Sequence, residues 1–242
     1  MCGPSGASGR PGAVTPETTL SHSHSSDTDA PAPSNAAASL RVFVPHSALC
    51  MAAFDLVISA ALPLSILHHS LRVYLFAKWL ADNEKSEWAD SDLLFVACVT
   101  HDIGASHKHD GPQRFEVEGA DAGADLVRSH NNSQGDAHEV WTAIALHTSP
   151  GIAERITPLA RLVRLGVLID FRPATRCSLG AVEYARDVEV RLPRLDIEKV
   201  LGDAVVEQAI RNPGKAPAAS WPNNLYKSHL DNPNWAGINR AF

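Results

Sequence analysis

The feature of this sequence that most constrains its fold is an apolar run that ends in two metal-binding residue types. Residues 93–104 read LLFVACVTHDIG, which predicts an apolar helix that brings His101 and Asp102 side by side at its last turn. Gly104 then allows the backbone to turn away. The imidazole and the carboxylate offer a nitrogen and an oxygen ligand to one divalent ion, a mixed set that suits Zn²⁺, Fe²⁺ or Mn²⁺.

Two further residues make this pair more than a chance dipeptide. His69 lies upstream in a second apolar-periodic stretch, and Asp170 lies downstream at the end of a third. Burying imidazoles and carboxylates together costs free energy unless the groups pair with one another or ligate a metal. The sequence therefore favours a metal site, and the alternative is a set of core polar groups that satisfy one another without an ion.

Composition divides the 242-residue chain into two parts. Residues 1–40 contain no Lys and no aromatic residue and are rich in Pro, Gly, Ser, Thr and Ala, which predicts a disordered extension. The extension has neither the apolar core of a signal peptide nor the basic character of a transit peptide, and we expect it to be dispensable for folding and activity. Residues 41–242 are long enough for one domain with a sizeable core.

Helical periodicity dominates the second part of the chain. The segments with helical spacing of apolar residues, or with helix caps such as Ser91 or Asp90, are 46–60, 64–82, about 91–104, 114–130, 136–147, 158–171, 178–190 and 196–211. No run with the period of a β-strand is found. We therefore predict an all-α fold, a single helical bundle.

The C-terminal stretch has a different character. Residues 221–242 read WPNNLYKSHLDNPNWAGINRAF, which indicates irregular backbone. Aromatic residues bury large areas, so we expect Trp221, Tyr226, Trp235 and Phe242 to pack along the domain. A loose tail with exposed rings is the alternative, since chain termini are often poorly ordered.

Charge and cysteine usage limit the partners and the compartment. The net charge of −6 and the isoelectric point near 6.0 come without a basic block, which argues against a nucleic-acid partner. No apolar run is long enough to span a membrane. Cys98 lies within the apolar run FVACV and no CxxC spacing occurs, which favours reduced thiols and a cytoplasmic location. We expect a small-molecule substrate as the partner and leave self-association open.

The order of His69, His101-Asp102 and Asp170 resembles the HD-domain superfamily of metal-dependent hydrolytic proteins. Within it, the chain is most similar to the cyanamide hydratase branch over about residues 46–235. The segments that carry this resemblance are HSLRVYLF, HDIG, RFEVEGADAG, WTAIALHTSPGIAE and LVRLGVLIDF.

The resemblance implies an all-helical protein that binds one divalent metal, usually zinc, and adds water to the nitrile of cyanamide to give urea. The implied ligands are His69, His101, Asp102 and Asp170. His68 does not match the family pattern at the twin histidine. Two roles of the metal stay open. It either activates a water for attack on the nitrile carbon, which we favour, or polarises the nitrile nitrogen. In the favoured role, Asp102 is counted as a catalytic residue as well as a ligand.

Other residues near these motifs are candidates for catalysis or substrate binding. His147 ends the apolar run AIALH and either moves protons or interacts with the end of a helix. Thr148 offers a hydroxyl to a small polar substrate or to the helix end.

Each charged residue that flanks these motifs also has a functional and a structural interpretation. Glu116 and Glu118 cannot share one helix face, so at most one reaches the pocket, and Glu116 with Arg114 can instead form a structural ion pair. Lys108 attracts an anionic substrate or is merely solvated. Arg72 orients a carboxylate such as Asp102 or Asp170.

Three other functions remain open from the sequence. An HD-type phosphohydrolase acting on a nucleotide or small phosphate ester would need a phosphate clamp, for which only Arg72, Lys108 and Arg114 are candidates. A metal-bearing interaction or sensor protein would lack turnover. A two-metal oxidase would need further ligands, which His130 or His147 could supply.

Overall fold

A computed structural model describes residues 38–242, and the predicted extension lies, apart from its last residues, outside the described residues. Every regular element in 38–242 is helical, which confirms the predicted all-α fold. The α-helices are α2 (Ala48–Ser59), α3 (Leu64–Glu84), α4 (Asp92–Thr100), α5 (Phe115–Ser129), α6 (Gln134–Ala145), α7 (Ala153–Ile156), α8 (Pro158–Phe171), α9 (Pro173–Ser178), α10 (Val182–Arg191), α11 (Ile197–Arg211) and α12 (Trp221–Asp231). Short 3-10 helices are η1 (Arg41–Phe43), η2 (Ile103–Ala105), η3 (His107–His109) and η4 (Pro213–Lys215).

Helix α4 lies at the centre of the bundle. Its residues 93–100 are all buried, so it has no solvent face, and α2, α3, α5, α6 and α8 surround it. Such a helix must be covered on every side, and this explains why its sequence carries no polar stripe. Ser91 caps its first turn by accepting a hydrogen bond from the Leu93 amide, one of the two predicted caps. The helix ends at Thr100, so His101 and Asp102 lie just beyond it rather than inside its last turn.

Two glycines allow backbones near the site to approach one another. A Cβ at Gly104 would lie 2.0 Å from the carbonyl oxygen of Phe115, and one at Gly166 would lie 2.7 Å from that of Val73. Any side chain at either position would push α5 away from η2, or α8 away from α3. The close contacts hold the segments that carry the predicted metal residues in fixed relative positions.

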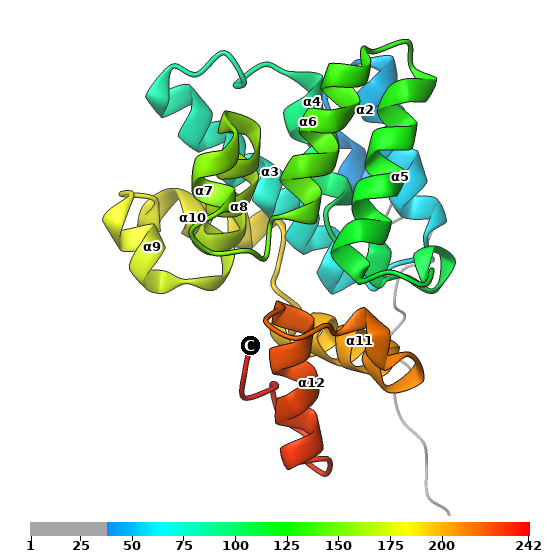
Figure 1. Cartoon of the computed structure of the whole chain (residues 1–242). Coiled ribbons are helices and arrows are strands. Elements are labelled where there is room, and N and C mark those ends of the chain that lie inside the picture. Colours follow the sequence, from blue (N-terminus) through cyan, green and yellow to red (C-terminus); the bar gives the residue numbers. More distant parts are fainter. Residues whose placement is uncertain (1–37) are drawn as a thin grey trace, which may run out of the picture.

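The last two long helices form a unit that we call the C-terminal cap, residues 197–242. In Figure 1 the cap lies below the helical core, which comprises α2 to α10. Helix α11 packs against α3 and η2 through a small apolar cluster of its own, in which Ile66 and Phe115 of the core meet Leu201, Val205 and Leu225 of the cap. Each fully buried side chain of this kind contributes about 1.5–3 kcal/mol, so the cap is held mainly by apolar burial.

Polar contacts fix the cap in register. The amide of Gln208 donates to the carbonyl oxygen of Gly104 at 2.8 Å, and the ammonium of buried Lys215 binds Asp110 at 2.5 Å and the carbonyl oxygen of Gly111 at 2.8 Å. Arg211 binds the second oxygen of Asp110 at 2.7 Å. The loop that follows the HDIG motif is therefore tied directly to α11 and η4.

The structure corrects two sequence predictions. Residues 221–242 are not wholly irregular, because α12 begins there with Ser220 as its cap and Pro222 in its first turn, where a proline loses no hydrogen bond. The helix expected at 178–190 begins four residues later, at Val182. The short helix α9 ends before it, and Gly180, with a φ of +70°, makes the turn between them. Among the described residues, no helix is long and apolar enough to cross a membrane.

Candidate metal centre and active site

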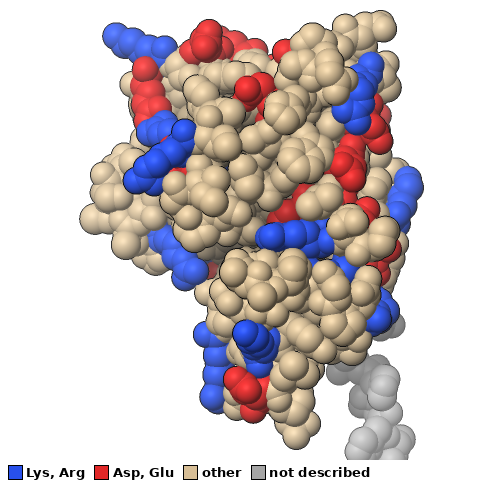
Figure 2. Space-filling model, in the orientation of Figure 1, with Lys and Arg blue, Asp and Glu red and all other residues tan. Residues whose placement is uncertain are grey.

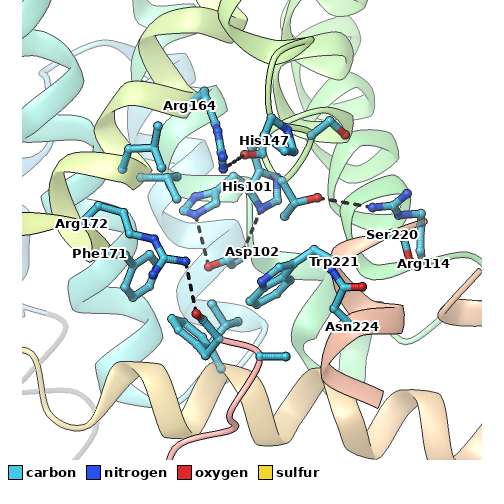
Figure 3. A pocket seen from close by; sticks show the side chains of 18 of the residues that line it. His101, Asp102, Arg114, His147, Arg164, Phe171, Arg172, Ser220, Trp221 and Asn224 are labelled. Atoms are coloured by element: carbon cyan, nitrogen blue, oxygen red, sulfur yellow. Dashed lines mark hydrogen bonds and ion pairs between the residues drawn. The ribbon is translucent and has the colours of Figure 1, made fainter. Parts of the chain in front are cut away.

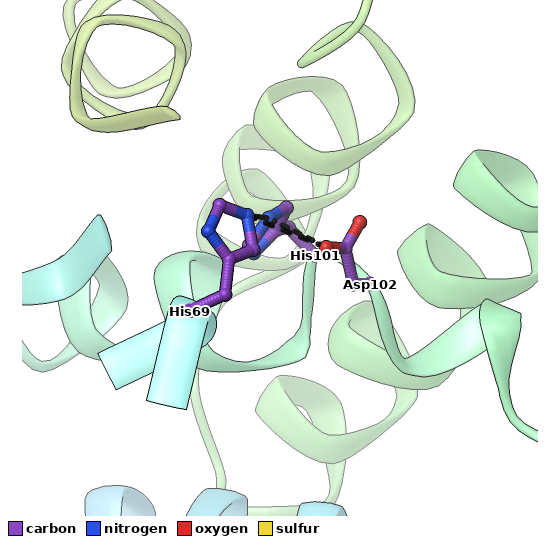
Figure 4. Close-up of side chains that lie close together, drawn as sticks. All are labelled: His69, His101 and Asp102. Atoms are coloured by element: carbon purple, nitrogen blue, oxygen red, sulfur yellow. Dashed lines mark hydrogen bonds and ion pairs between the residues drawn. The ribbon is translucent and has the colours of Figure 1, made fainter. Parts of the chain in front are cut away.

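Three of the four predicted ligands converge at one buried point (Figure 4). His69 comes from the middle of α3, and His101 and Asp102 follow α4, so two separate helices place them together. One ligand atom of each residue lies within 4.8 Å of the others. Asp102 Oδ2 is 3.2 Å from His101 Nε2 and 3.5 Å from His69 Nε2. All three side chains are at most 1% exposed.

The hydrogen bonds around this cluster fix the tautomers of both imidazoles. His101 Nδ1 lies 2.7 Å from the carbonyl oxygen of Cys98, which only accepts, so this nitrogen carries the proton. His69 Nδ1 likewise donates to Asp170 Oδ2 at 2.6 Å. When neutral, both rings therefore present an unprotonated Nε2, and these two atoms face each other at 3.2 Å.

The environment of the Asp102 carboxylate also indicates a metal site. Both of its oxygens are buried without a hydrogen-bond partner of acceptable geometry, although three imidazoles lie within 3.5 Å. Two facing nitrogen lone pairs beside an unpartnered carboxylate are costly unless a cation lies among them. The donor set fits a divalent ion such as Zn²⁺, Fe²⁺ or Mn²⁺, and its identity is not specified by these residues.

The electrostatics of the cluster are those of a cation site. Burial opposes ionisation of Asp102, yet the neighbouring His101, His147 and His69 hold the pKa of this carboxyl well below its usual range. Burial also opposes protonation of His101, but the adjacent Asp102 raises the pKa of that imidazole above its ordinary value. Burial lowers the pKa of His69 in spite of the Asp170 carboxylate. Asp102 thus stays ionised and ready to bind positive charge.

Asp170, the fourth predicted ligand, lies behind His69 rather than within the cluster. Its carboxylate accepts two hydrogen bonds from buried Arg72, each at 2.8 Å, and one from Arg194 at 3.0 Å. Burial opposes its ionisation, but Arg72 and His69 lower the pKa of this carboxyl far below its usual value. In this arrangement Asp170 orients His69 and fixes its tautomer, as outer-sphere carboxylates do for metal-binding histidines. The prediction that Arg72 orients a carboxylate is confirmed.

His147 joins the cluster from the loop after α6. Its Nδ1 donates to the carbonyl oxygen of Ile144 at 2.6 Å, which leaves Nε2 unprotonated in the neutral ring, 3.5 Å from Asp102 Oδ1. Arg164 holds the same residue by donating to its carbonyl oxygen at 2.9 Å. The expected contact with the helix end is present, and the ring also lies beside the metal residues, while its role in proton transfer stays a prediction.

Glu116, Arg114 and Thr148 form a closed group at one side of the site. Glu116 is fully buried and receives Arg114 on both oxygens, at 2.9 and 2.5 Å, so the predicted ion pair is confirmed. The hydroxyl of Thr148 donates to Glu116 at 2.7 Å and accepts from Arg114 at 3.3 Å. The proton of this hydroxyl is therefore already bound to Glu116. Arg114 and Thr148 line the pocket, and Glu116 supports them from behind.

Several other candidates lie away from the site. Lys108 is exposed and binds Ser59 at 2.9 Å, and Glu118 accepts from the backbone of Gln113. His68 points to the carbonyl oxygen of Pro193, and His130 contacts the carbonyl oxygen of Leu126. Within residues 38–242 no second group of three metal-binding residues is found, and of the two further ligands that a two-metal centre could use, only His147 lies beside the cluster.

The metal residues lie at the base of a pocket of about 550 Å³ (Figure 3). Sequence reasoning missed much of its lining. The lining residues that it did not assign to the site are Ser149, Pro150, Ile152, Arg164, Val167, Leu168, Phe171, Arg172, Leu201, Ala219, Ser220, Trp221, Asn224, Ala241 and Phe242. Trp221 and Phe242 were expected only to pack along the domain, which they do against Phe115 and Phe171. Nothing in their spacing indicated that they reach the pocket.

Comparison with known proteins agrees with this geometry. Residues 66–165 match the HD domain family. The match covers the part of the chain that carries the metal cluster, and it shows similarity to HD domains over that part. The matched range includes His69, His101, Asp102 and His147, and HD domains bind divalent metals, in accord with the His-His-Asp cluster.

The chain is also similar to two curated proteins of Saccharomyces cerevisiae, cyanamide hydratase DDI2 and cyanamide hydratase DDI3. It is 25% identical to each over 134 residues, which is 54% of this chain and 59% of each yeast protein. The family match and this distant similarity support an enzyme of the metal-dependent HD type.

Proposed function

We propose that this protein hydrates a small nitrile, with cyanamide as the substrate and urea as the product. The observation that carries the proposal is the position of His147. Its unprotonated Nε2 points to Asp102 beside the three-residue metal cluster, inside a pocket that opens to solvent. The similarity to the yeast cyanamide hydratases gives the reaction its substrate.

A divalent ion bound by His69, His101 and Asp102 would supply a water acidified toward a pKa of about 7 and polarisation of an unsaturated substrate. The chain itself provides the proton transfer. His147 Nε2 accepts a proton from the attacking water while the water oxygen bonds to the nitrile carbon. The same imidazole then returns the proton to the nitrile nitrogen. The resulting isourea tautomerises to urea, and no other reactant is needed.

Surrounding residues hold this geometry. Asp170 and Arg72 keep His69 in the tautomer that leaves Nε2 free, and Cys98 does the same for His101 through its carbonyl oxygen. Arg164 anchors the backbone of His147. Because the rings are fixed before the substrate binds, no free energy is lost in arranging them during the reaction.

A phosphohydrolase is the second candidate, and one observation favours it. Arg114, Arg164 and Arg172 line the pocket, whereas the earlier candidates Lys108 and Arg72 do not. Two of the three are neutralised, Arg114 by Glu116 and Arg164 by Glu154. Only Arg172 forms no ion pair with an Asp or Glu side chain within 38–242, and it already binds the main-chain oxygen of Phe242, which makes it a weak clamp for a phosphate group.

A screen of zinc-loaded protein separates the two functions. We expect urea from cyanamide and no phosphate from nucleotides or simple phosphate esters. Phosphate release without urea would overturn the proposal in favour of the phosphohydrolase. The reducing, cytoplasmic compartment stays a prediction, with buried Cys98 as its basis. The absence of a nucleic-acid partner also stays a prediction, and Figure 2 shows basic and acidic residues interspersed on the face that it draws.

A further inference from the structure

The pocket is much larger than cyanamide requires. Its volume of about 550 Å³ lies in the range of sites that enclose drug-sized ligands, about 300–1,000 Å³. A molecule with only an N–C–N skeleton reaches about millimolar affinity at the best binding efficiency per atom. Cyanamide would leave most of the lining without a contact.

The lining is aromatic on the side that faces the metal residues. Phe171, at the end of α8, lies 4.5 Å from His69, measured between ring centroids, and Phe242 lies 5.0 Å from Phe171. Trp221 lies 5.5 Å from Phe242. We call Phe171, Trp221 and Phe242 the aromatic wall. All three line the cavity and are only partly buried, so each keeps ring surface for a ligand.

The aromatic wall continues into the catalytic residues at both ends. From Trp221 the contacts run to Phe115 at 5.9 Å and from Phe115 to His147 at 5.6 Å. His147 lies 4.8 Å from His101, and His101 lies 5.1 Å from His69, so the chain of ring contacts closes on itself. Because Phe171 contacts His69, a flat ring placed against the wall beside Phe171 would have its substituent next to the metal cluster.

The charges around the wall select against a cation. Three arginines line the pocket, of which Arg114 and Arg164 are paired with glutamates, and Asp102 is the one acidic side chain in the lining. Arg172 is exposed at its edge and donates to the carbonyl oxygen of Phe242 at 3.2 Å, which leaves further N–H groups free. Arg172 therefore disfavours a positively charged ligand, and the paired arginines leave room for an uncharged one.

We propose that the substrate of this site carries an aromatic ring next to its nitrile group, as an aryl cyanamide does, and that Trp221 and Phe242 select it. The inference rests on the proposed hydration reaction and deepens it. Water adds across the same C≡N bond, with oxygen bonding to carbon and both hydrogens ending on nitrogen, so phenylcyanamide would give phenylurea. Apolar stacking against the wall holds the ring.

The test compares substrates that share one reacting group and differ only in the ring. Urea, methylurea and phenylurea formation from cyanamide, methylcyanamide and phenylcyanamide would be followed by chromatography with zinc-loaded full-length protein. We expect kcat/KM to be at least about tenfold higher for phenylcyanamide than for cyanamide, with methylcyanamide close to cyanamide. Calorimetry should show phenylurea binding at least about tenfold more tightly than urea, a readout that does not depend on turnover.

Variants of the aromatic wall then test whether its side chains cause the preference for phenylcyanamide. Trp221→Ala and Phe242→Ala should each lower the ratio of phenylcyanamide to cyanamide turnover by about tenfold or more, while Trp221→Phe retains most of it. Trp235→Ala is the matched control, because Trp235 belongs to the same cap, is 51% exposed and lies outside the pocket, and the ratio should not change. Bound zinc and the circular dichroism spectrum would verify that each variant is folded.

The outcomes separate this inference from the proposed function. Hydration of cyanamide with equal or poorer use of phenylcyanamide, and no preference for phenylurea, would overturn the aromatic substrate while the hydratase stands. A wall variant that slows both substrates equally would show that the rings serve only to pack the cap, which also overturns it. Phosphate release without hydration of any cyanamide would reject the proposed function itself.

Discussion

The helical core and the C-terminal cap build the pocket by different physical means. In the core, polar side chains are buried and each imidazole is tied through Nδ1 to a fixed acceptor, such as the carbonyl oxygen of Cys98 or the carboxylate of Asp170. In the cap, partly exposed rings and small residues shape the wall, and no charged side chain of the cap reaches the metal residues. The reactive groups therefore come from the core, whereas the shape of the pocket comes from both parts, with Phe171 of the core facing Phe242 of the cap.

Because of this difference, substitutions in the core and in the cap should change different properties of the protein. The HD domain match ends at residue 165, before the cap begins, and the residues that face the metal all lie inside the match. The cap meets the core through a small apolar cluster and the Asp110 ion pairs. Substitutions in the core should therefore change metal binding and chemistry, and substitutions in the cap should change selectivity and local stability.

The largest expected effect comes from removing metal ligands of the core. His101→Ala and Asp102→Ala should each remove the bound metal and abolish activity, because each deletes one of three converging ligands. Metal per chain would be measured by plasma emission spectroscopy after dialysis. His68→Ala is the matched control, since this ring faces Pro193, and it should keep its metal. Full zinc occupancy in the doubly substituted His101→Ala, Asp102→Ala protein would refute the ligand assignment.

A smaller effect separates chemistry from metal binding within the core. His147→Ala should lower kcat by about 10²-fold or more while the metal stays bound, because a proton acceptor is lost and the three ligands are not. His130→Ala is a suitable control, since His130 also binds a backbone carbonyl but lies outside the pocket. Unchanged turnover in His147→Ala would remove this residue from the mechanism.

The role of Asp170 can be read from the size of its effect on metal binding. If Asp170 acts through His69, Asp170→Asn should weaken metal affinity by about 10–100-fold without abolishing it. Competition with a chelator would measure this, with Asp102→Asn alongside for comparison. An equal loss in both variants would show that Asp170 is a direct ligand, as the family resemblance implied. Thermal unfolding should also be affected, because buried Arg72 loses its charged partner.

The junction between core and cap predicts a change in stability. Asp110→Asn should lower the free energy of unfolding by about 1–3 kcal/mol, because Lys215, whose side chain is 3% exposed, loses a charged partner. Burial opposes ionisation of Asp110, but Lys215 and Arg211 outweigh it and lower the pKa of the carboxyl. A carboxyl whose pKa is lowered by folding stabilises the protein above its unfolded value, about 3.9, and that contribution disappears as the pH falls below it.

Thermal melts between pH 7 and pH 3 would measure this junction. The difference in melting temperature between the wild type and Asp110→Asn should become smaller as the pH falls. Asp203→Asn is the control, because Asp203 pairs with Lys199 on the exposed face of α11, where such pairs contribute only about 0.3–0.5 kcal/mol. A difference in stability that keeps its full size from pH 7 to pH 3 would show that the hydrogen bonds, rather than the charge, hold the cap.

The smallest expected effect concerns Lys108, which the sequence offered as a substrate-binding residue. Its ammonium binds Ser59 on the surface, so Lys108→Ala should change kcat/KM by less than about twofold. Arg172→Gln serves as the comparison, because that arginine does line the pocket and should alter KM. A large loss in Lys108→Ala would show that the loop after HDIG folds over the substrate.

Much of the core could be predicted from the sequence because its signals are local. A fully apolar run indicates a helix without a solvent face, and α4 is that helix. The motif order predicted the grouping of His69, His101 and Asp102, which the structure brings together. The Arg114–Glu116 pair was equally local, two positions apart on the chain.

The positions of Asp170 and of the pocket wall could not be predicted in this way. Whether Asp170 meets the ion or His69 Nδ1 depends on Arg72 and Arg194, which arrive from α3 and from the loop before α11. Helix α12 was missed because prolines and asparagines indicate a loop, whereas Ser220 and Pro222 in fact begin a helix. These outcomes depend on residues far apart in the chain.

The sequence by itself determined that the chain is helical and that imidazoles and carboxylates are buried in its core, since helical periodicity and the cost of burying polar groups act locally. Only the tertiary structure decided which nitrogen of each imidazole faces the site and which surfaces enclose it. Tautomers depend on acceptors such as the Asp170 carboxylate, and the aromatic wall depends on Trp221 and Phe242 folding back onto Phe171. Such contacts form only once the apolar core has brought distant segments together, so no short stretch of sequence encodes them.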